Sequence, residues 1–179
     1  DRERAIVRAE LEHQPRFLAF SMLMFHCALR PKEIFMLQPE HFSSERQCID
    51  VPPHISKNGN YRAAAIPNVL VDLVDSLNIG GQNPDHYVFS KHFEAGPKLM
   101  NSTHSGKAWK ALAKKLGLPP EVKHYSLRDT GLLQLARDGV SRIDTQNHFD
   151  HSSAAMQDIY SRHLQAEGNM AVKVKATAF

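Results

Sequence analysis

Cysteine is scarce in this sequence of 179 residues, which contains only Cys27 and Cys48. Two isolated cysteines resemble neither a disulfide framework nor a zinc motif, so we expect a reducing compartment. The sequence also lacks a phosphate-binding loop, a dinucleotide-binding fingerprint and a Gly-x-Ser-x-Gly elbow. These absences argue against a nucleotide cofactor.

Long apolar runs are absent as well. Residues 17–29 form the most apolar stretch, but it is too short to cross a bilayer and it contains His26, so we interpret it as a buried core helix. No secretory signal is visible, and we expect a cytoplasmic protein without a membrane partner. Lys and Arg number 22 against 19 Asp and Glu, and the resulting net charge of +3 permits DNA binding without demanding it.

Histidines suggest a metal site at two places, the pair His148 and His151 and the pair His86 and His92. Neither pair has a third and a fourth ligand at a recognisable spacing, and the cysteines are distant. We therefore expect no metal cofactor.

Apolar periodicity predicts a mainly helical fold. Helices are expected at about residues 1–37, with Pro15 and Pro31 in first-turn positions, and at 69–77, 103–116, 127–136 and a short segment capped by Ser141. Residues 47–67 instead indicate short extended pieces around Asn58-Gly59, a strong hairpin signal, and residues 87–89 indicate another short strand. We expect one mixed α+β domain over residues 1–179, mainly α-helical with a small antiparallel sheet.

Two arginines stand in contexts that suit phosphate binding, because guanidinium groups bind phosphate oxygens bidentately. Arg30 lies at the junction of two expected helices, with Glu33 one turn further on to hold it by a salt bridge. Arg128 lies at an expected helix start, where backbone N–H groups also favour an anion. The alternatives are a surface ion pair for Arg30 and a solvated helix position for Arg128.

Three further side chains complete a set for phosphoryl transfer. Lys57, beside the hairpin turn, suits a general acid that protonates a departing oxygen, and otherwise it is a solubilising turn residue. His151, nine residues before Tyr160, suits a hydrogen-bond donor to phosphate or a proton shuttle. Tyr160 is able to form a covalent intermediate, although an isolated tyrosine is more often a core residue.

The order and spacing of these segments resemble the catalytic domain of the tyrosine recombinase, or phage integrase, family. The resemblance rests on Ala-Leu-Arg-Pro-Lys-Glu-Ile at 28–34, Ser-Lys-Asn-Gly at 56–59, Tyr-Ser-Leu-Arg-Asp-Thr at 125–130, and Asp-His-Ser-Ser at 150–153 followed by Tyr160. It implies a helical domain with a three-stranded antiparallel sheet. It also implies paired phosphate-binding arginines, Arg30 and Arg128, with Lys57 as acid, His151 before the nucleophile and Tyr160 as the nucleophile.

Two positions depart from the family pattern. Tyr125 stands where the family usually has histidine, three residues before Arg128, and His124 lies one place earlier. A phenol can hydrogen-bond a phosphate but is a poor base at neutral pH. Asp150 replaces a usual glycine before His151 and adds a negative charge near the phosphate site. Neither change removes a charge-stabilising group, so we expect activity to survive, with Tyr125 in the catalytic set.

The resemblance implies a site-specific DNA recombinase that cleaves and rejoins double-stranded DNA through a 3′-phosphotyrosyl intermediate, without ATP, cofactor or obligate metal. The family's N-terminal core-binding domain is expected to be absent from this chain. We expect a homotetramer of the full-length protein on DNA, a monomer for this domain alone, and a bacterial or phage-encoded, nucleoid-associated protein. Two alternatives stay open: strand relaxation of the type IB topoisomerase kind, and a catalytically silent DNA-binding module of the same fold.

Overall fold

Two of the three N-terminal helices begin at the prolines that signal a helix start. In the computed structural model, which describes residues 2–149, the three helices are α1 (Arg2–Leu11), α2 (Pro15–His26) and α3 (Pro31–Met36). Both prolines occupy the first turn of their helix, where a missing N–H costs nothing and the fixed φ favours helix. Arg30 is the residue immediately before α3, as predicted for a helix junction.

The later helices also follow the prediction closely. They are α4 (Asn68–Asp75), α5 (Thr103–Leu116), α6 (Ser126–Arg137) and α7 (Arg142–Phe149), together with the short 3₁₀ turns η1 (Pro39–His41), η2 (Ile79–Gly81) and η3 (Lys91–Phe93). Gly117 ends α5 in the left-handed conformation, with φ of 63°. Ser141 caps α7: its Oγ accepts the N–H of Asp144 at 3.1 Å, and its hydroxyl donates to the Asp144 carboxylate at 2.6 Å.

The extended region forms the small antiparallel sheet, which confirms the predicted fold class. Its strands are β1 (Phe42–Ser43), β2 (Cys48–Val51) and β3 (Arg62–Ala65), in the order β1-β2-β3. The prediction of a tight turn at Asn58-Gly59 is wrong in detail, because residues 52–61 form a longer loop between β2 and β3. Within it, the Gly59 N–H reaches the Ser56 carbonyl at 3.2 Å, so Lys57 lies inside a local turn of the loop rather than on a strand.

The strand expected at residues 87–89 does not form. Tyr87 makes one isolated antiparallel bridge with Gly96, through N–H to oxygen bonds of 2.9 and 3.1 Å. The next residue after Gly96 is Pro97, which has no N–H to extend the pairing. Val88 and Phe89 are nevertheless fully buried. The apolar run at 87–89 therefore indicates a buried segment and not a strand.

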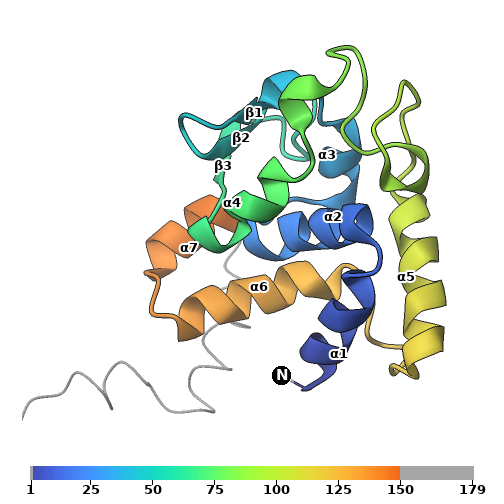
Figure 1. The fold of residues 1–179 in the computed structure, drawn as a ribbon. Helices are drawn as coiled ribbons and strands as arrows, with labels where there is room; N and C mark the ends of the chain where they lie inside the picture. Colours follow the sequence, from blue (N-terminus) through green and yellow to red (C-terminus); the bar gives the residue numbers. More distant parts are fainter. Residues whose placement is uncertain (1, 150–179) are drawn as a thin grey trace, which may run out of the picture.

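Helix α2 is the centre of the fold. Figure 1 shows α6 running alongside it, with α5 standing at one side of the molecule and α7 at the other. Phe20 of α2 packs against Phe35, Phe89 and Phe93, and this aromatic group anchors the main core. A second, smaller cluster of Ala28, Leu132 and Phe149 joins the end of α2 to α6 and α7. None of the described helices is both long and apolar enough to span a membrane.

Candidate active site

Arg30 is held by Glu33 in a buried pair. The Arg30 Nη1 donates to Glu33 Oε1 at 2.9 Å, and the Arg30 backbone N–H donates to Oε2 at 2.8 Å. Only 11% of the Arg30 side chain and 1% of the Glu33 side chain are exposed. The predicted salt bridge is therefore present, and the alternative of a weak surface pair is wrong because burial protects the pair from solvent screening.

The ionised form of Glu33 is favoured despite its burial. Burial acts to raise the pKa of this carboxyl, but the Arg30 backbone N–H and the charges of Arg62 and Arg30 together hold the pKa below its ordinary value. A fixed negative charge thus lies beneath Arg30 and orients its guanidinium.

Arg128 enters from the first turn of α6 and is completely buried, so the alternative of a solvated helix arginine is wrong. Its Nε donates to the Ala28 carbonyl at 2.8 Å and its Nη2 to the Phe149 carbonyl at 2.6 Å. The Phe149 ring lies 5.1 Å from the guanidinium carbon. Burial lowers the pKa of Arg128, and the nearby charges of Arg30 and Arg62 lower it further, so the three guanidiniums share one region.

Arg62, on β3, is a member of this group that the sequence reasoning missed. Its Nη2 lies 3.1 Å from Glu33 Oε2 and 3.3 Å from the Ala28 oxygen, and its Nη1 lies 3.2 Å from the His148 oxygen. The sequence offered one signal for this role: Arg62 is the first residue of β3, the strand that follows the loop at 52–61. Nothing local distinguishes it from a solvated strand arginine, since its partners are 29 to 86 positions away.

Lys57 is exposed on the loop between β2 and β3, and its backbone N–H lies 3.3 Å from Glu33 Oε1. Lys57, Arg30 and Tyr125 line a common cavity of about 960 Å³ beside α5. Of the described residues that line this cavity, six are cationic and none is Asp or Glu; the six are Arg30, Lys32, Lys57, Lys110, Lys114 and Lys123. The net charge of the whole sequence is only +3, yet six positively charged side chains gather around this one cavity.

Tyr125 and His124 both border the cavity, but they differ sharply in burial although they are neighbours in sequence. Tyr125 is 42% exposed, lines the cavity, and places its hydroxyl 3.4 Å from Arg128 Nη1. His124 is buried, stacks on Trp109 with ring centroids 4.9 Å apart, and shares a 3.0 Å hydrogen bond with Ser21 Oγ. Burial lowers the pKa of His124 to about 3, so it is a neutral core residue.

The predicted nucleophile Tyr160 and the predicted His151 lie outside the described residues, and so does Asp150. Phe149 is the last described residue before them in the sequence, and its carbonyl accepts a hydrogen bond from Arg128. The structure therefore brings together Arg30, Lys57, Tyr125 and Arg128.

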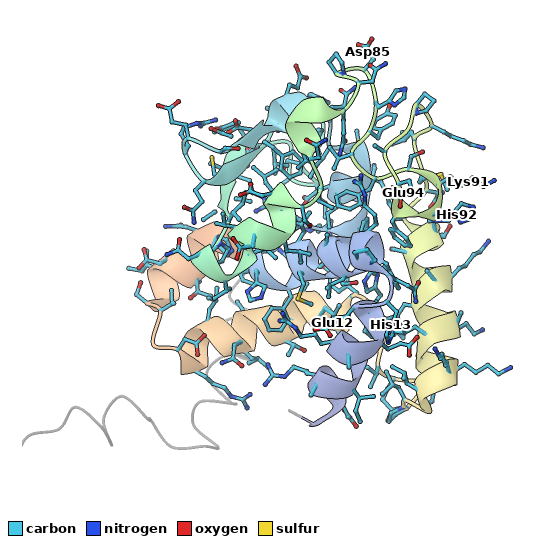
Figure 2. All side chains as sticks on the ribbon, viewed as in Figure 1. Glu12, His13, Asp85, Lys91, His92 and Glu94 are labelled. Atoms are coloured by element: carbon cyan, nitrogen blue, oxygen red, sulfur yellow. The ribbon has the colours of Figure 1, made fainter. Side chains whose placement is uncertain are left out.

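The remaining histidines do not form part of a metal-binding group within residues 2–149, where no three His, Cys, Asp or Glu side chains gather as ligands would. His148 hydrogen-bonds the His26 carbonyl at 2.7 Å, and burial lowers its pKa. Figure 2 shows His92 beside Lys91 at the outer edge of the molecule, near the start of α5.

The phage integrase family model matches residues 3–167. The fold resembles that of XerA recombinase, with a TM-score of 0.77 and 18% identity over 99% of this chain and 65% of that one. It also resembles lambda integrase (residues 75–356), solved as a dimer bound to a COC′ core site, with a TM-score of 0.67 and 18% identity over 88% of this chain and 56% of that one.

A third similar structure is the Tn1549 transposon integrase in complex with circular intermediate DNA, with a TM-score of 0.63 and 17% identity over 85% of this chain and 57% of that one. The chain spans less than two thirds of each of these three proteins. No curated protein matches the chain by sequence. Because the family model covers most of its length, the chain belongs to the phage integrase family.

Proposed function

We propose that this domain is the catalytic part of a site-specific DNA recombinase that cleaves and rejoins double-stranded DNA through a 3′-phosphotyrosyl intermediate. The observation that carries the proposal is the cavity that has six cationic and no acidic residues in its described lining, next to buried Arg128. A duplex presents a dense row of phosphates, and clustered Lys and Arg supply most of the affinity for it. Membership of the phage integrase family supports the same conclusion.

In the proposed reaction the scissile phosphate binds at Arg30 and Arg128, which stabilise the charge that grows on its non-bridging oxygens. The oxygen of Tyr160 attacks phosphorus and its phenolic proton passes to solvent, directly or through His151, while the bond to the 5′ oxygen breaks. Lys57 gives a proton to that oxygen, leaving a free 5′-hydroxyl and a phosphotyrosyl ester. His151 takes part as a hydrogen-bond donor to phosphate or as a proton shuttle.

The ester preserves the energy of the broken bond. Attack by a 5′-hydroxyl from another strand reverses the chemistry and releases Tyr160, so the reaction needs no ATP. The full-length protein acts as a homotetramer on DNA, because exchange between two duplexes involves four cleavage sites, and this domain alone is a monomer. We place the protein in the cytoplasm, at the nucleoid.

The test is a protein–DNA adduct on a denaturing gel, formed by the full-length protein on a suicide substrate whose cleaved end diffuses away. Tyr160→Phe should abolish the adduct and leave DNA binding nearly unchanged, since only the nucleophilic oxygen is removed. An adduct of undiminished yield in Tyr160→Phe would refute the assignment. Strand exchange between two marked duplexes then separates a recombinase from a topoisomerase-like enzyme, which rejoins the same strand.

A further inference from the structure

We propose that Arg62 is a positioning residue of this active site, which fixes the two phosphate-binding arginines relative to one another and to the end of α7. The role rests on the proposed function above. Arg62 is 9% exposed and joins three acceptors: the Glu33 carboxylate, the Ala28 carbonyl and the His148 carbonyl. These acceptors belong to α3, to the link between α2 and α3, and to α7.

The first contact acts on Arg30. Glu33 binds Arg30 through both carboxylate oxygens, and Arg62 of strand β3 donates to one of these oxygens, Oε2, at 3.1 Å. A buried carboxylate shared by two guanidiniums has one favourable orientation, because each oxygen then has its donors. Without Arg62, Oε2 keeps only the Arg30 backbone N–H as a donor, so the carboxylate is held less firmly and the guanidinium of Arg30 with it.

The second contact acts on Arg128. Its Nε and the Nη2 of Arg62 both donate to the Ala28 carbonyl, at 2.8 and 3.3 Å. Ala28 has φ of 57°, a left-handed conformation that is uncommon for alanine and that the surrounding structure must stabilise. Two guanidiniums on one carbonyl oxygen supply that stabilisation, so the shared carbonyl couples the position of Arg128 to that of Arg62.

The third contact acts on the end of α7. Arg62 donates to the His148 carbonyl, and Arg128 donates to the next one along the chain, that of Phe149. The last carbonyls of a helix have no partner within it and favour cations. The two arginines thus fasten the helix end that leads toward His151 and Tyr160.

Arg62 acts through these groups rather than on substrate. Its side chain is 9% exposed, and both of its terminal nitrogens already donate to protein acceptors. The three acceptors surround a planar fork, and two of its nitrogens are needed to reach them. A lysine offers one nitrogen on a flexible stem and cannot reproduce that geometry.

The experiment compares single-turnover cleavage by the full-length protein on two DNA substrates. One has an ordinary scissile phosphate, and the other has a methylphosphonate there, which lacks the negative charge that Arg30 and Arg128 neutralise. We expect Arg62→Ala to lower cleavage of the ordinary substrate by about 10- to 100-fold at unchanged DNA affinity. On the methylphosphonate substrate, the cleavage rate of Arg62→Ala should return toward the wild-type rate on the same substrate, and Arg30→Ala should behave in the same way.

Arg46→Ala is the matched control, since Arg46 is an exposed arginine beside β1 that pairs with Asp50, and its loss should leave both rates unchanged. Arg62→Lys should cleave the ordinary substrate faster than Arg62→Ala but more slowly than the wild type. If Arg62→Ala does not fold, the two substrates are compared with Arg62→Lys instead. Equal losses on the two substrates, or cleavage at the wild-type rate by both Arg62 variants, would overturn the positioning role alone. A wild-type protein that forms no adduct would overturn the proposed function, and this role with it.

Discussion

Gly131 of α6 lies so close to the backbone of Phe25 in α2 that a Cβ at Gly131 would stand 1.9 Å from the Phe25 carbonyl oxygen. The two helices therefore pack at backbone distance at this point. Arg128 is three residues before Gly131, almost one helical turn, so the contact sets the depth at which Arg128 enters the core. A glycine that looks unfavourable inside a helix thus has a packing reason.

Gly131→Ala should lower the free energy of unfolding by about 1–3 kcal/mol, because the clash is with backbone and no rotamer change relieves it. Cleavage should fall as well, since α6 must shift and carry Arg128 with it. Urea denaturation measures the first effect. Gly106→Ala near the start of α5 is the control: nothing lies within 4 Å of an added Cβ there, and replacing a helical glycine by alanine should stabilise the fold by up to about 1 kcal/mol. Equal stability of the two variants would contradict the packing argument.

Lys57→Ala should cleave an ordinary substrate slowly and should recover on a substrate whose leaving 5′ oxygen is replaced by sulfur. A thiolate departs without a proton, so the general acid is then dispensable. The measurement is the single-turnover rate on both substrates. The position of Lys57 in the cavity lining, beside Arg30, is consistent with this role. Defects of the same size on both substrates would leave Lys57 as a phosphate contact or a turn residue.

Tyr125→Phe should reduce cleavage by only a modest factor, about tenfold or less, because it removes a neutral hydrogen-bond donor and leaves the charged groups in place. The hydroxyl lies 3.4 Å from Arg128 Nη1 in the cavity wall, where it can orient a phosphate oxygen. Tyr125→His should keep or raise activity. A loss as severe as that in Tyr160→Phe would instead give Tyr125 an essential chemical role; rates measured from pH 6 to 9 decide between the two.

His124 should make the fold sensitive to acid. Burial lowers the pKa of His124 in the folded chain to about 3. In the unfolded chain its pKa is about 6.5, so between pH 6.5 and pH 3 the unfolded chain binds a proton that the folded chain does not bind. The contribution of neutral His124 to the free energy of unfolding is fully present above pH 6.5 and is lost progressively as the pH falls toward 3. Between pH 7 and pH 5 we expect a loss of about 1–2 kcal/mol from this residue.

A double variant tests the assignment to His124. Replacing the hydrogen-bonded pair together, as His124→Phe with Ser21→Ala, keeps an aromatic ring against Trp109 and leaves no orphaned hydroxyl. Its unfolding free energy should fall less between pH 7 and pH 5 than that of the wild type. Parallel curves would show that other buried groups cause the acid sensitivity.

The sequence by itself determined the features that depend on near neighbours along the chain. Prolines marked the starts of α2 and α3, Gly117 the end of α5, and Ser141 with Asp144 the cap of α7. The Arg30–Glu33 pair was predictable for the same reason, because residues three apart on a helix face one another. The order of the motifs was enough to identify the family, which the family model confirms.

Only the tertiary structure decided which distant groups meet. Arg62 meets its partners because packing brings three separate segments together, and Arg128 is buried because the link after α2 and the end of α7 supply the carbonyls that accept its hydrogen bonds. His124 and Tyr125 are adjacent in sequence, yet His124 is buried against Trp109 and Tyr125 is exposed, and periodicity could not separate them at a turn before α6. Local signals extend over one helical turn or one strand, whereas hydrogen bonds between residues 100 positions apart exist only once the chain has packed.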